Sequence, residues 1–271
     1  MNSEPREKVL IKYGGNAMTD KKLQKEVIRT IKSLTQENYQ PILVHGGGPF
    51  IEQFLEYGKC NSEFIQGLRH TTNEAIPFVE AALRGYVNGQ LVEMALQEGL
   101  KAVGLSAKDG AAVECKPKMV KILGEDKSIG RVGDVHHINT NLYQSLLDQD
   151  YFLILNSIAM HANGDSYNIN ADIFAGSLAA ALKVDHFLVL SNIDGLMKNP
   201  KDKSSLINNI SQKEMEAADD IEISEGMMPK MEACFTAARA GVKNVRIING
   251  SAAANIKKAL TESELGTRIQ Y

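Results

Sequence analysis

Two apolar, strand-like runs in this chain each end directly in a cluster of glycines. The first cluster, Gly14-Gly15, follows Lys12, and the second, residues 46–48, follows His45. At the carboxyl end of a buried strand, glycines let backbone N–H groups approach an anion, and the following helix directs its positive end there. Lys12 adds an ammonium group at the same rim. The two clusters together predict a phosphate-binding cradle between neighbouring parallel strands, with a pair of ordinary tight turns as the alternative.

Strand and helix patterns alternate between and after these clusters. Thr19 or Asp20 can cap a helix whose apolar residues recur at helical spacing, at Leu23, Val27, Ile28, Ile31 and Leu34. The strand 41–44 follows directly, so the segment is a βαβ unit with parallel strands and a right-handed crossover. The sequence therefore predicts an α/β fold around a mostly parallel, buried sheet.

The remaining elements continue this alternation, apart from one region of hairpins. We expect a helix over 72–98 that is interrupted near Gly85 and Gly89, and hairpins over 111–135, where short alternating runs are separated by turn residues. Ser211 and Glu214 form a capping box that opens a short helix. The other expected helices are 142–149, 171–182, 228–240 and 252–260, and the other expected strands are 102–105, 152–155, 187–190, 245–248 and a closing edge strand at 267–269.

The charge balance and the cysteines exclude several classes of function. Thirty Lys and Arg against 33 Asp and Glu give a net charge of −3, so we expect no nucleic-acid partner, which would need a basic surface. No apolar run approaches the ~20 residues of a membrane span, and the charged first residues lack the apolar segment of an export signal. Cys60, Cys115 and Cys234 lack disulfide or zinc-site spacing, and we interpret them as buried thiols of a cytoplasmic protein.

Six short motifs, in order along the whole chain, make the sequence resemble the N-acetylglutamate kinases of the amino-acid kinase family. They are KYGGNAM at 12–18, HGGGP at 45–49, GLR at 67–69, VGLS with KDG at 103–110, NINAD at 168–172 and GMMPK at 226–230. The dinucleotide-binding fingerprint and the Walker P-loop are absent from the sequence. The resemblance implies ATP-dependent phosphorylation of the γ-carboxylate of N-acetyl-L-glutamate, in arginine biosynthesis.

The resemblance also implies an architecture. The family's architecture is a three-layer αβα sandwich around a mostly parallel open sheet, in two lobes, and we expect the same here. Residues 1–182 would bind the acid and form a dimer, and residues 183–271 would bind the nucleotide. Because no linker or low-complexity segment separates the two halves, we expect them to share one sheet with a weak boundary near residue 182.

In the family, two lysines lie on opposite sides of the migrating phosphoryl group, and Lys12 and Lys230 match them. Phosphoryl transfer needs mainly positioning and charge neutralisation, which ammonium groups supply. Asp172 matches the residue that orients both lysines. It can also act as the N-cap of the helix that it begins, and the two roles are compatible. Gly15 and Gly47 complete the catalytic residues that the resemblance implies.

The acid would be bound by Arg69 and by residues near the second glycine cluster. A guanidinium group can hold a carboxylate at two points, and the resemblance assigns Arg69 to the α-carboxylate, with an ordinary surface arginine as the alternative. It assigns Asn168 and Asn170 to the carboxylate and acetamido groups, and Gly47 and Gly48 to the acceptor side of the phosphoryl group. A γ-carboxylate is already ionised at neutral pH, so we expect no general base.

ATP is the expected cosubstrate, with Mg²⁺ held mainly by phosphate oxygens and water rather than by a protein ligand. The loop after the strand 187–190 would hold the adenosine part, as the carboxyl end of a buried strand does in α/β folds. The nucleotide-binding residues implied are Lys12, Gly14, Gly15, Ser191, Asn192, Asp194, Gly195, Gly226, Met227 and Lys230. The histidines have no metal-ligand spacing, and we expect His45 to orient the backbone of the glycine turn.

Departures from the family pattern leave some properties open. His70 stands where the family usually has a small apolar residue, Gly89 where it has a lysine, and Ala107 where it has a glycine. These differences leave open which acid the protein prefers, but not the class of reaction. An N-acetylaminoadipate kinase and a non-catalytic arginine-sensing module remain alternatives, whereas GLR and NINAD argue against carbamate and uridylate kinases. Only about seven residues precede the first strand, without the helix that joins arginine-regulated members into hexamers. We therefore expect an arginine-insensitive homodimer. A nitrogen-signalling regulator is a possible partner that the sequence does not identify.

Overall fold

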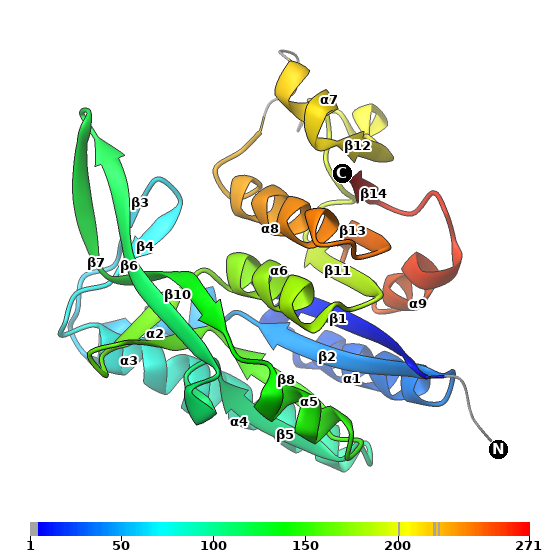
Figure 1. Cartoon of the computed structure of the whole chain (residues 1–271), viewed down its shortest axis with the longest axis horizontal. Coiled ribbons are helices and arrows are strands. Elements are labelled where there is room, and N and C mark those ends of the chain that lie inside the picture. The colour runs from blue at the N-terminus through cyan, green and yellow to red at the C-terminus, as the bar shows by residue number, and fades with distance from the viewer. Residues whose placement is uncertain (1–4, 200, 219–220, 222) are drawn as a thin grey trace.

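The computed structural model describes residues 5–199, 201–218, 221 and 223–271. Within these residues, an eight-stranded sheet forms the centre of the molecule (Figure 1). The strands, in spatial order, are β12 (Asn209–Ser211), β14 (Thr267–Gln270), β13 (Asn244–Asn249), β11 (His186–Ser191), β1 (Glu7–Tyr13), β2 (Tyr39–His45), β8 (Phe152–Asn156) and β5 (Ala102–Ser106). The prediction about the chain's start falls partly on residues 1–4, outside the described residues.

The sheet is mostly parallel and open, as predicted. β1 lies inside it and pairs in parallel with β2 on one side and β11 on the other, whereas β14 runs antiparallel to β13. The prediction of an edge strand at 267–269 is wrong, because β14 lies between β13 and the edge strand β12. β12 has three residues, too few for a period-two pattern to reveal it in the sequence.

Helices cover both faces of the sheet, which confirms the three-layer sandwich. α5 (Asn141–Leu147), α6 (Ala171–Leu182) and α8 (Met228–Arg239) pack on one face. α1 (Lys21–Thr35), α4 (Asn88–Gln97) and α9 (Ala254–Thr261) pack on the other face. Both faces of the sheet carry apolar side chains, and the helices stabilise the fold by removing both faces from water.

The ends of two helices follow the capping predictions. The carboxylate of Asp20 accepts hydrogen bonds from the backbone N–H groups of Lys22 and Leu23 at the start of α1. α7 (Gln212–Ala217) opens with the capping box of Ser211 and Glu214. Both signals are local in sequence, which explains why they could be predicted.

The expected helix over 72–98 is present in a different form. It consists of α3 (Ile76–Glu80), the π-helix η2 (Ala81–Val87) and α4, without a break. Gly85 lies in the π-helical turns, and Gly89 lies within the first turn of α4. A glycine lowers helix propensity without ending a helix that is held by packing, so the predicted interruption became a local change of helix type.

A second β structure rises from the sheet (Figure 1). The predicted hairpins are one long hairpin of β6 (Val113–Ile122) and β7 (Glu125–Ile138), which closes a small barrel with β9 (Ile158–His161) and β10 (Ser166–Ile169). The short hairpin of β3 (Glu63–Ile65) and β4 (Leu68–His70) packs beside β7, and Thr71 bridges Gly130. The strands β3, β4, β9 and β10 were not predicted from the sequence.

The remaining helical segments connect the elements described above. They are α2 (Gly48–Tyr57) and the 3₁₀ turns η1 (Gly15–Met18), η3 (Asp109–Ala111) and η4 (Lys203–Ser205). In the described part of the chain, no helix combines the length and the apolar character needed to cross a bilayer. Cys115 and Cys234 are buried free thiols as predicted, whereas Cys60 is only half-buried.

Candidate active site

The first glycine turn places an ammonium group at the carboxyl end of β1. Lys12 is 5% exposed, and its side chain lies beside Gly14, where a Cβ atom would lie 2.6 Å from the Lys12 Nζ. Gly15 adopts φ +73°, a conformation that favours glycine. The glycines are therefore required by the position of the lysine and by the turn that follows it.

The second glycine turn joins the end of β2 to the start of α2. Gly47 is the N-cap of α2, and Gly48 is its first residue. A Cβ atom at Gly47 would lie 2.8 Å from the Leu83 Cδ2 atom, so the π-helix η2 packs directly against this turn. The first N–H groups of a helix have no partners within the helix, so this turn directs free donors at the carboxyl edge of the sheet.

His45 and Asn88 form a buried hydrogen-bond network beside the second glycine turn. The Nδ1 atom of the buried His45 lies 2.8 Å from the Gly46 carbonyl, and its Nε2 atom lies 3.0 Å from the Asn88 Nδ2 atom. Asn88 also donates to the Ile154 carbonyl at 2.9 Å. This network fits a neutral ring that donates through Nδ1 and accepts at Nε2, and it agrees with the predicted role of His45 in orienting the backbone.

This histidine predicts a loss of stability in acid. Burial lowers the pKa of His45 from 6.5 to about 4, against the opposing effect of its hydrogen bond to Gly46. Between these values the unfolded chain binds a proton that the folded chain refuses, so stability falls as the pH falls, by about 2 kcal/mol from pH 7.5 to 5. Urea unfolding at both pH values should show this loss for the wild type and a smaller loss for His45→Asn. The control is His136→Asn, an exposed position on β7, and equal losses in wild type and His45→Asn would contradict the prediction.

Asp172 joins the two predicted catalytic lysines. The Lys12 Nζ lies 2.9 Å from one Asp172 carboxylate oxygen, and the Lys230 Nζ lies 3.0 Å from the other. Lys12 comes from β1, Asp172 from the first turn of α6, and Lys230 from the first turn of α8. Lys230 also donates to the Gly226 carbonyl at 3.3 Å. The fold thus brings together residues that are 160 and 58 positions apart in the sequence.

The electrostatics of this cluster are those of a buried ion triad. Burial lowers the pKa of Lys12, and the charge of Asp172 opposes that effect. Burial also opposes the ionisation of Asp172, but the charges of Lys12 and Lys230 outweigh it and hold the pKa of this carboxyl below its usual value. We expect Asp172 to stay ionised at neutral pH and to hold both ammonium groups in place.

Asp172 lies in the first turn of α6 and is not its cap, so the prediction of a capping role is wrong. The N-cap of α6 is Asn170, whose Oδ1 atom accepts hydrogen bonds from the backbone N–H groups of Asp172 and Ile173 at 2.9 and 3.3 Å. A side-chain oxygen at the cap satisfies donors that the helix leaves free. The amide oxygen of Asn170 is therefore already used by α6.

Arg69 is buried on the short strand β4. Its side chain is 7% exposed, and its Nη1 atom donates to Glu52 at 2.6 Å and to the Ser62 hydroxyl. The guanidinium carbon lies 4.6 Å from the centre of the Phe64 ring. The structure does not support an ordinary surface arginine, because a charged group is buried this deeply only where it is paired.

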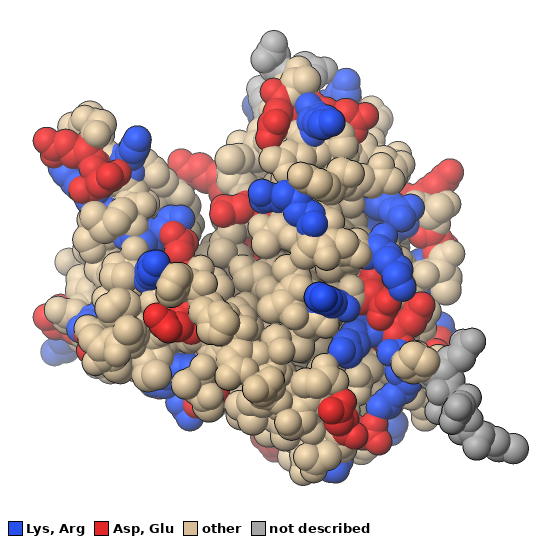
Figure 2. Space-filling model, in the orientation of Figure 1, with Lys and Arg blue, Asp and Glu red and all other residues tan. Residues whose placement is uncertain are grey.

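A pocket of about 200 Å³ brings these groups together. Figure 2 shows the face of the molecule seen in Figure 1, which is hollowed between the β6–β7 hairpin and the part that carries α7 and α8. The predicted residues that line the pocket are Lys12, Gly14, Gly15, Gly47, Gly48, Arg69, Asn168, Asn170 and Asp172. Further residues that line the pocket were not predicted from the sequence, among them Ile51, Phe64, Leu83 and Ser157.

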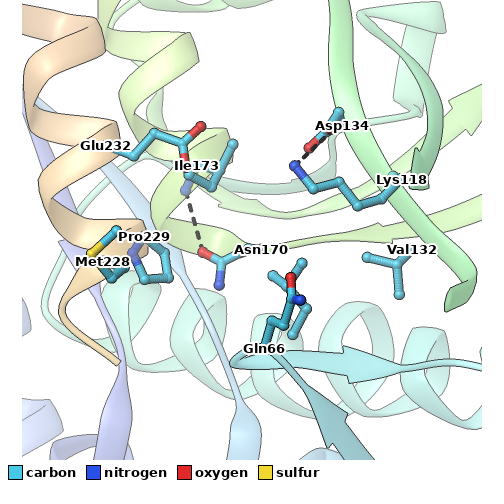
Figure 3. Close-up of a pocket in the computed structure, with 11 residues that line it drawn as sticks. Gln66, Lys118, Val132, Asp134, Asn170, Ile173, Met228, Pro229 and Glu232 are labelled. Carbon is cyan, nitrogen blue, oxygen red and sulfur yellow. Dashed lines mark hydrogen bonds and ion pairs between the residues drawn. The ribbon is translucent and has the colours of Figure 1, made fainter. Parts of the chain in front are cut away.

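A second pocket of about 110 Å³ adjoins the first and shares Leu68, Val132 and Asn170 with it. Figure 3 shows Asn170 between Pro229, at the start of α8, and the residues of the β6–β7 hairpin. On the hairpin side, Lys118 and Asp134 form an ion pair of 2.9 Å. The hollow therefore extends from the glycine turns to the start of α8.

The predicted nucleotide residues of the second half do not line the pocket with Lys12. Ser191 ends β11, and Asp194 accepts a hydrogen bond of 2.7 Å from Asn249 at the end of β13. Asn192 is exposed and Gly195 is buried in the same loop. Gly226 and the buried Met227 precede α8. These two groups lie at the carboxyl edge of β11 and β13 and beside Lys230.

A glycine-lined edge of a parallel sheet, with two lysines joined by a buried aspartate, defines an α/β protein built to handle phosphoryl groups. Residues 7–249 match the amino acid kinase family, and the chain belongs to that family. The predicted resemblance is confirmed.

Individual relatives span almost the entire chain. It is 37% identical over 269 residues to an acetylglutamate kinase of Methanococcus aeolicus, which covers 97% of this chain and 92% of the relative. The solved structure of smu.665 from Streptococcus mutans has a TM-score of 0.79 and 30% identity, and covers 97% of this chain and 98% of that one. Carbamate kinase from Giardia lamblia, bound to AMP-PNP, shares the fold, with a TM-score of 0.71 and 17% identity over 98% of each chain.

Proposed function

We propose that this protein transfers the terminal phosphoryl group of ATP to the γ-carboxylate of N-acetyl-L-glutamate, a step in arginine biosynthesis. The observation that carries the proposal is the convergence of Lys12 and Lys230 on Asp172, beside a pocket that presents Arg69. Kinase relatives that match over nearly the full chain support this choice of acid.

The two lysines would neutralise the charge of the phosphoryl group in transit. An oxygen of the γ-carboxylate attacks the γ-phosphorus, and the bond to the oxygen bridging the β- and γ-phosphates breaks, so that its electron pair leaves with ADP. Charge spreads over the oxygens of the migrating group. Ammonium groups already fixed by Asp172 need not reorganise during transfer, which is the main source of such catalysis. The acceptor is ionised before it reacts, so no proton has to be removed.

The acid would lie between Arg69 and the second glycine turn. Arg69 would hold its α-carboxylate, Asn168 and Asn170 its carboxylate and acetamido groups, and the N–H groups of Gly47 and Gly48 the reacting end. All five residues line the pocket with Lys12. Because the Asn170 oxygen caps α6, we expect this residue to contact the acid through its amide nitrogen.

The nucleotide would reach the same cradle from the other side. We propose that Gly14 and Gly15 contact its terminal phosphates, that Ser191, Asn192, Asp194 and Gly195 lie near the adenosine part, and that Gly226 and Met227 lie along the phosphates. Among the described residues that line the pocket, Asp172 is the one carboxylate, and both its oxygens contact lysines. Mg²⁺ therefore fits here as an ion held by ATP oxygens and water.

We also propose a division of labour between the lobes. Residues 1–182 supply Arg69 and the acid site, and residues 183–271 supply the loop after β11 and Lys230. We propose a homodimer that works in the cytoplasm and does not respond to arginine. Sedimentation velocity with and without arginine tests this assembly, and a hexamer or strong inhibition by arginine would count against it.

A coupled ADP-release assay tests the function directly. Purified protein would be offered N-acetylglutamate, N-acetylaminoadipate, glutamate, carbamate and UMP with ATP and Mg²⁺. We expect the highest kcat/KM with N-acetylglutamate. The preference over N-acetylaminoadipate should be only about 10- to 200-fold, because a pocket distinguishes one methylene by ~1–3 kcal/mol. A clear preference for carbamate or UMP, or no ADP release with any acid, would refute the proposal.

Arg69→Lys should raise the KM for the acid about tenfold or more and leave the KM for ATP near its wild-type value. The lysine keeps the charge but loses the planar fork that holds a carboxylate at two points. Steady-state kinetics with each substrate varied in turn measure both constants. Arg84→Lys is the control, because Arg84 pairs with Asp109 outside the pocket. Equal increases of both constants would show Arg69 to be only structural.

A further inference from the structure

Glu52 and Ser62 both contact one nitrogen atom of Arg69. Glu52 accepts a hydrogen bond of 3.1 Å from the Ser62 hydroxyl, and both side chains accept hydrogen bonds from the Arg69 Nη1 atom. The three side chains thus form a closed ring of contacts. A charged hydrogen bond restricts a side chain more when its acceptor is also hydrogen-bonded to a neighbouring side chain than when it is the only contact.

The other donors of Arg69 remain available. Among the described residues, its Nε and Nη2 atoms have no recorded hydrogen-bond partner, although the side chain is 7% exposed and lines the pocket. Phe64, the cross-strand partner of Arg69, lies against the guanidinium group at 4.6 Å. A buried arginine with one nitrogen fixed and two unpaired donors is prepared for a planar anion.

Glu52 also connects the two ends of the acid site. It lies on α2, whose first turn begins at Gly48, and Ile51 beside it lines the pocket. Arg69 lies on the β3–β4 hairpin, a separate element. The contact between Glu52 and Arg69 therefore fixes the distance between the glycine turn and the guanidinium group, which is the distance that an acid of a given length must span.

Resting on the proposed function, we propose that Glu52 is a positioning residue for Arg69. With Ser62, it orients the guanidinium group toward the α-carboxylate and sets the spacing that favours N-acetylglutamate over its homologue with one more methylene. Glu52 itself touches neither substrate. Its loss should weaken acid binding and relax the choice of acid, with little effect on ATP or on the transfer step.

The test compares Glu52→Ala, Glu52→Gln and Ser62→Ala with wild type. Glu52→Ala should raise the KM for N-acetylglutamate about two- to fivefold, with kcat and the KM for ATP nearly unchanged, because an ion pair with a half-exposed partner contributes no more than about 1 kcal/mol. Glu52→Gln keeps the oxygen acceptor and should recover part of the loss. The ratio of kcat/KM for the two acids should fall several-fold in Glu52→Ala. Glu56→Ala, exposed one turn further along α2, is the matched control.

A double-mutant cycle separates positioning from general damage. In an Arg69→Ala background, Glu52→Ala should cause no further increase in the KM for the acid, because the residue through which it acts is gone. Thermal unfolding of each variant, together with calorimetric binding of N-acetylglutamate without nucleotide, identifies variants that fail only by unfolding. An unchanged KM in a folded Glu52→Ala protein, or full additivity in the cycle, overturns this inference. Wild-type protein that phosphorylates no acid would instead refute the proposed function.

Discussion

Replacing Lys12 by alanine is expected to lower kcat about 100- to 1000-fold while the protein stays folded. Lys12 presents its ammonium group at the glycine turn, 2.9 Å from Asp172. Its charge is needed mostly when charge moves between the phosphate oxygens, so its loss should appear in kcat more than in either KM. Asp172 keeps Lys230 as a partner in this variant, so it is not left as an isolated buried charge.

Single-turnover and steady-state kinetics, with circular dichroism for the fold, measure this effect. Lys8→Ala is the control on the same strand. Lys8 lies at the opposite end of β1 from Lys12 and donates a hydrogen bond to Gln144 on α5. Lys12→Arg keeps the charge and should recover little activity. The Lys12 Nζ fills the space beside Gly14, 2.6 Å from where a Cβ atom would lie, and the planar guanidinium group is larger than the ammonium group and directs its donors differently. Turnover within a few fold of wild type in Lys12→Ala would remove this lysine from the catalytic centre.

Features that depend on neighbouring residues could be predicted from the sequence. The glycine turns, the caps of α1 and α7 and the alternation of strands and helices all express local rules of backbone conformation and hydrophobic spacing. The position of Lys12 at the end of β1 belongs to this class, because only Tyr13 separates it from Gly14. For the same reason, the parallel sheet and its carboxyl edge followed from the first βαβ unit.

Contacts between distant segments could not be predicted in this way. The pairing of Asp172 with Lys12 and Lys230 joins β1, α6 and α8, and only the resemblance to a family suggested it. Glu52 and Ser62 were missed because their partner Arg69 lies on a hairpin of two three-residue strands, which is too short to show a period. Tertiary packing also overrode propensity at Gly89, which lies inside a helix.

Removing the carboxylate is expected to be more damaging than removing either lysine. Asp172→Ala would leave Lys12, 5% exposed, without its counter-charge and next to a second ammonium group. Breaking a buried ion pair from one side costs about 3–5 kcal/mol of folding free energy. Turnover should fall at least as far as in Lys12→Ala, because both lysines lose the group that orients them. Urea unfolding and the ADP-release assay measure the two losses separately.

A double substitution distinguishes the stability role of Asp172 from its catalytic role. In Lys12→Met combined with Asp172→Leu, the buried pair is replaced by apolar side chains of similar size, and such replacements are often neutral or stabilising. We expect this variant to recover most of the folding free energy that Asp172→Ala loses, while its turnover stays as low. If Asp172→Ala unfolds at the same urea concentration as wild type, the triad does not contribute to the fold as the geometry indicates. If the double variant regains turnover, neither Lys12 nor Asp172 acts on the phosphoryl group, and the charge of Lys230 alone would have to account for the transfer.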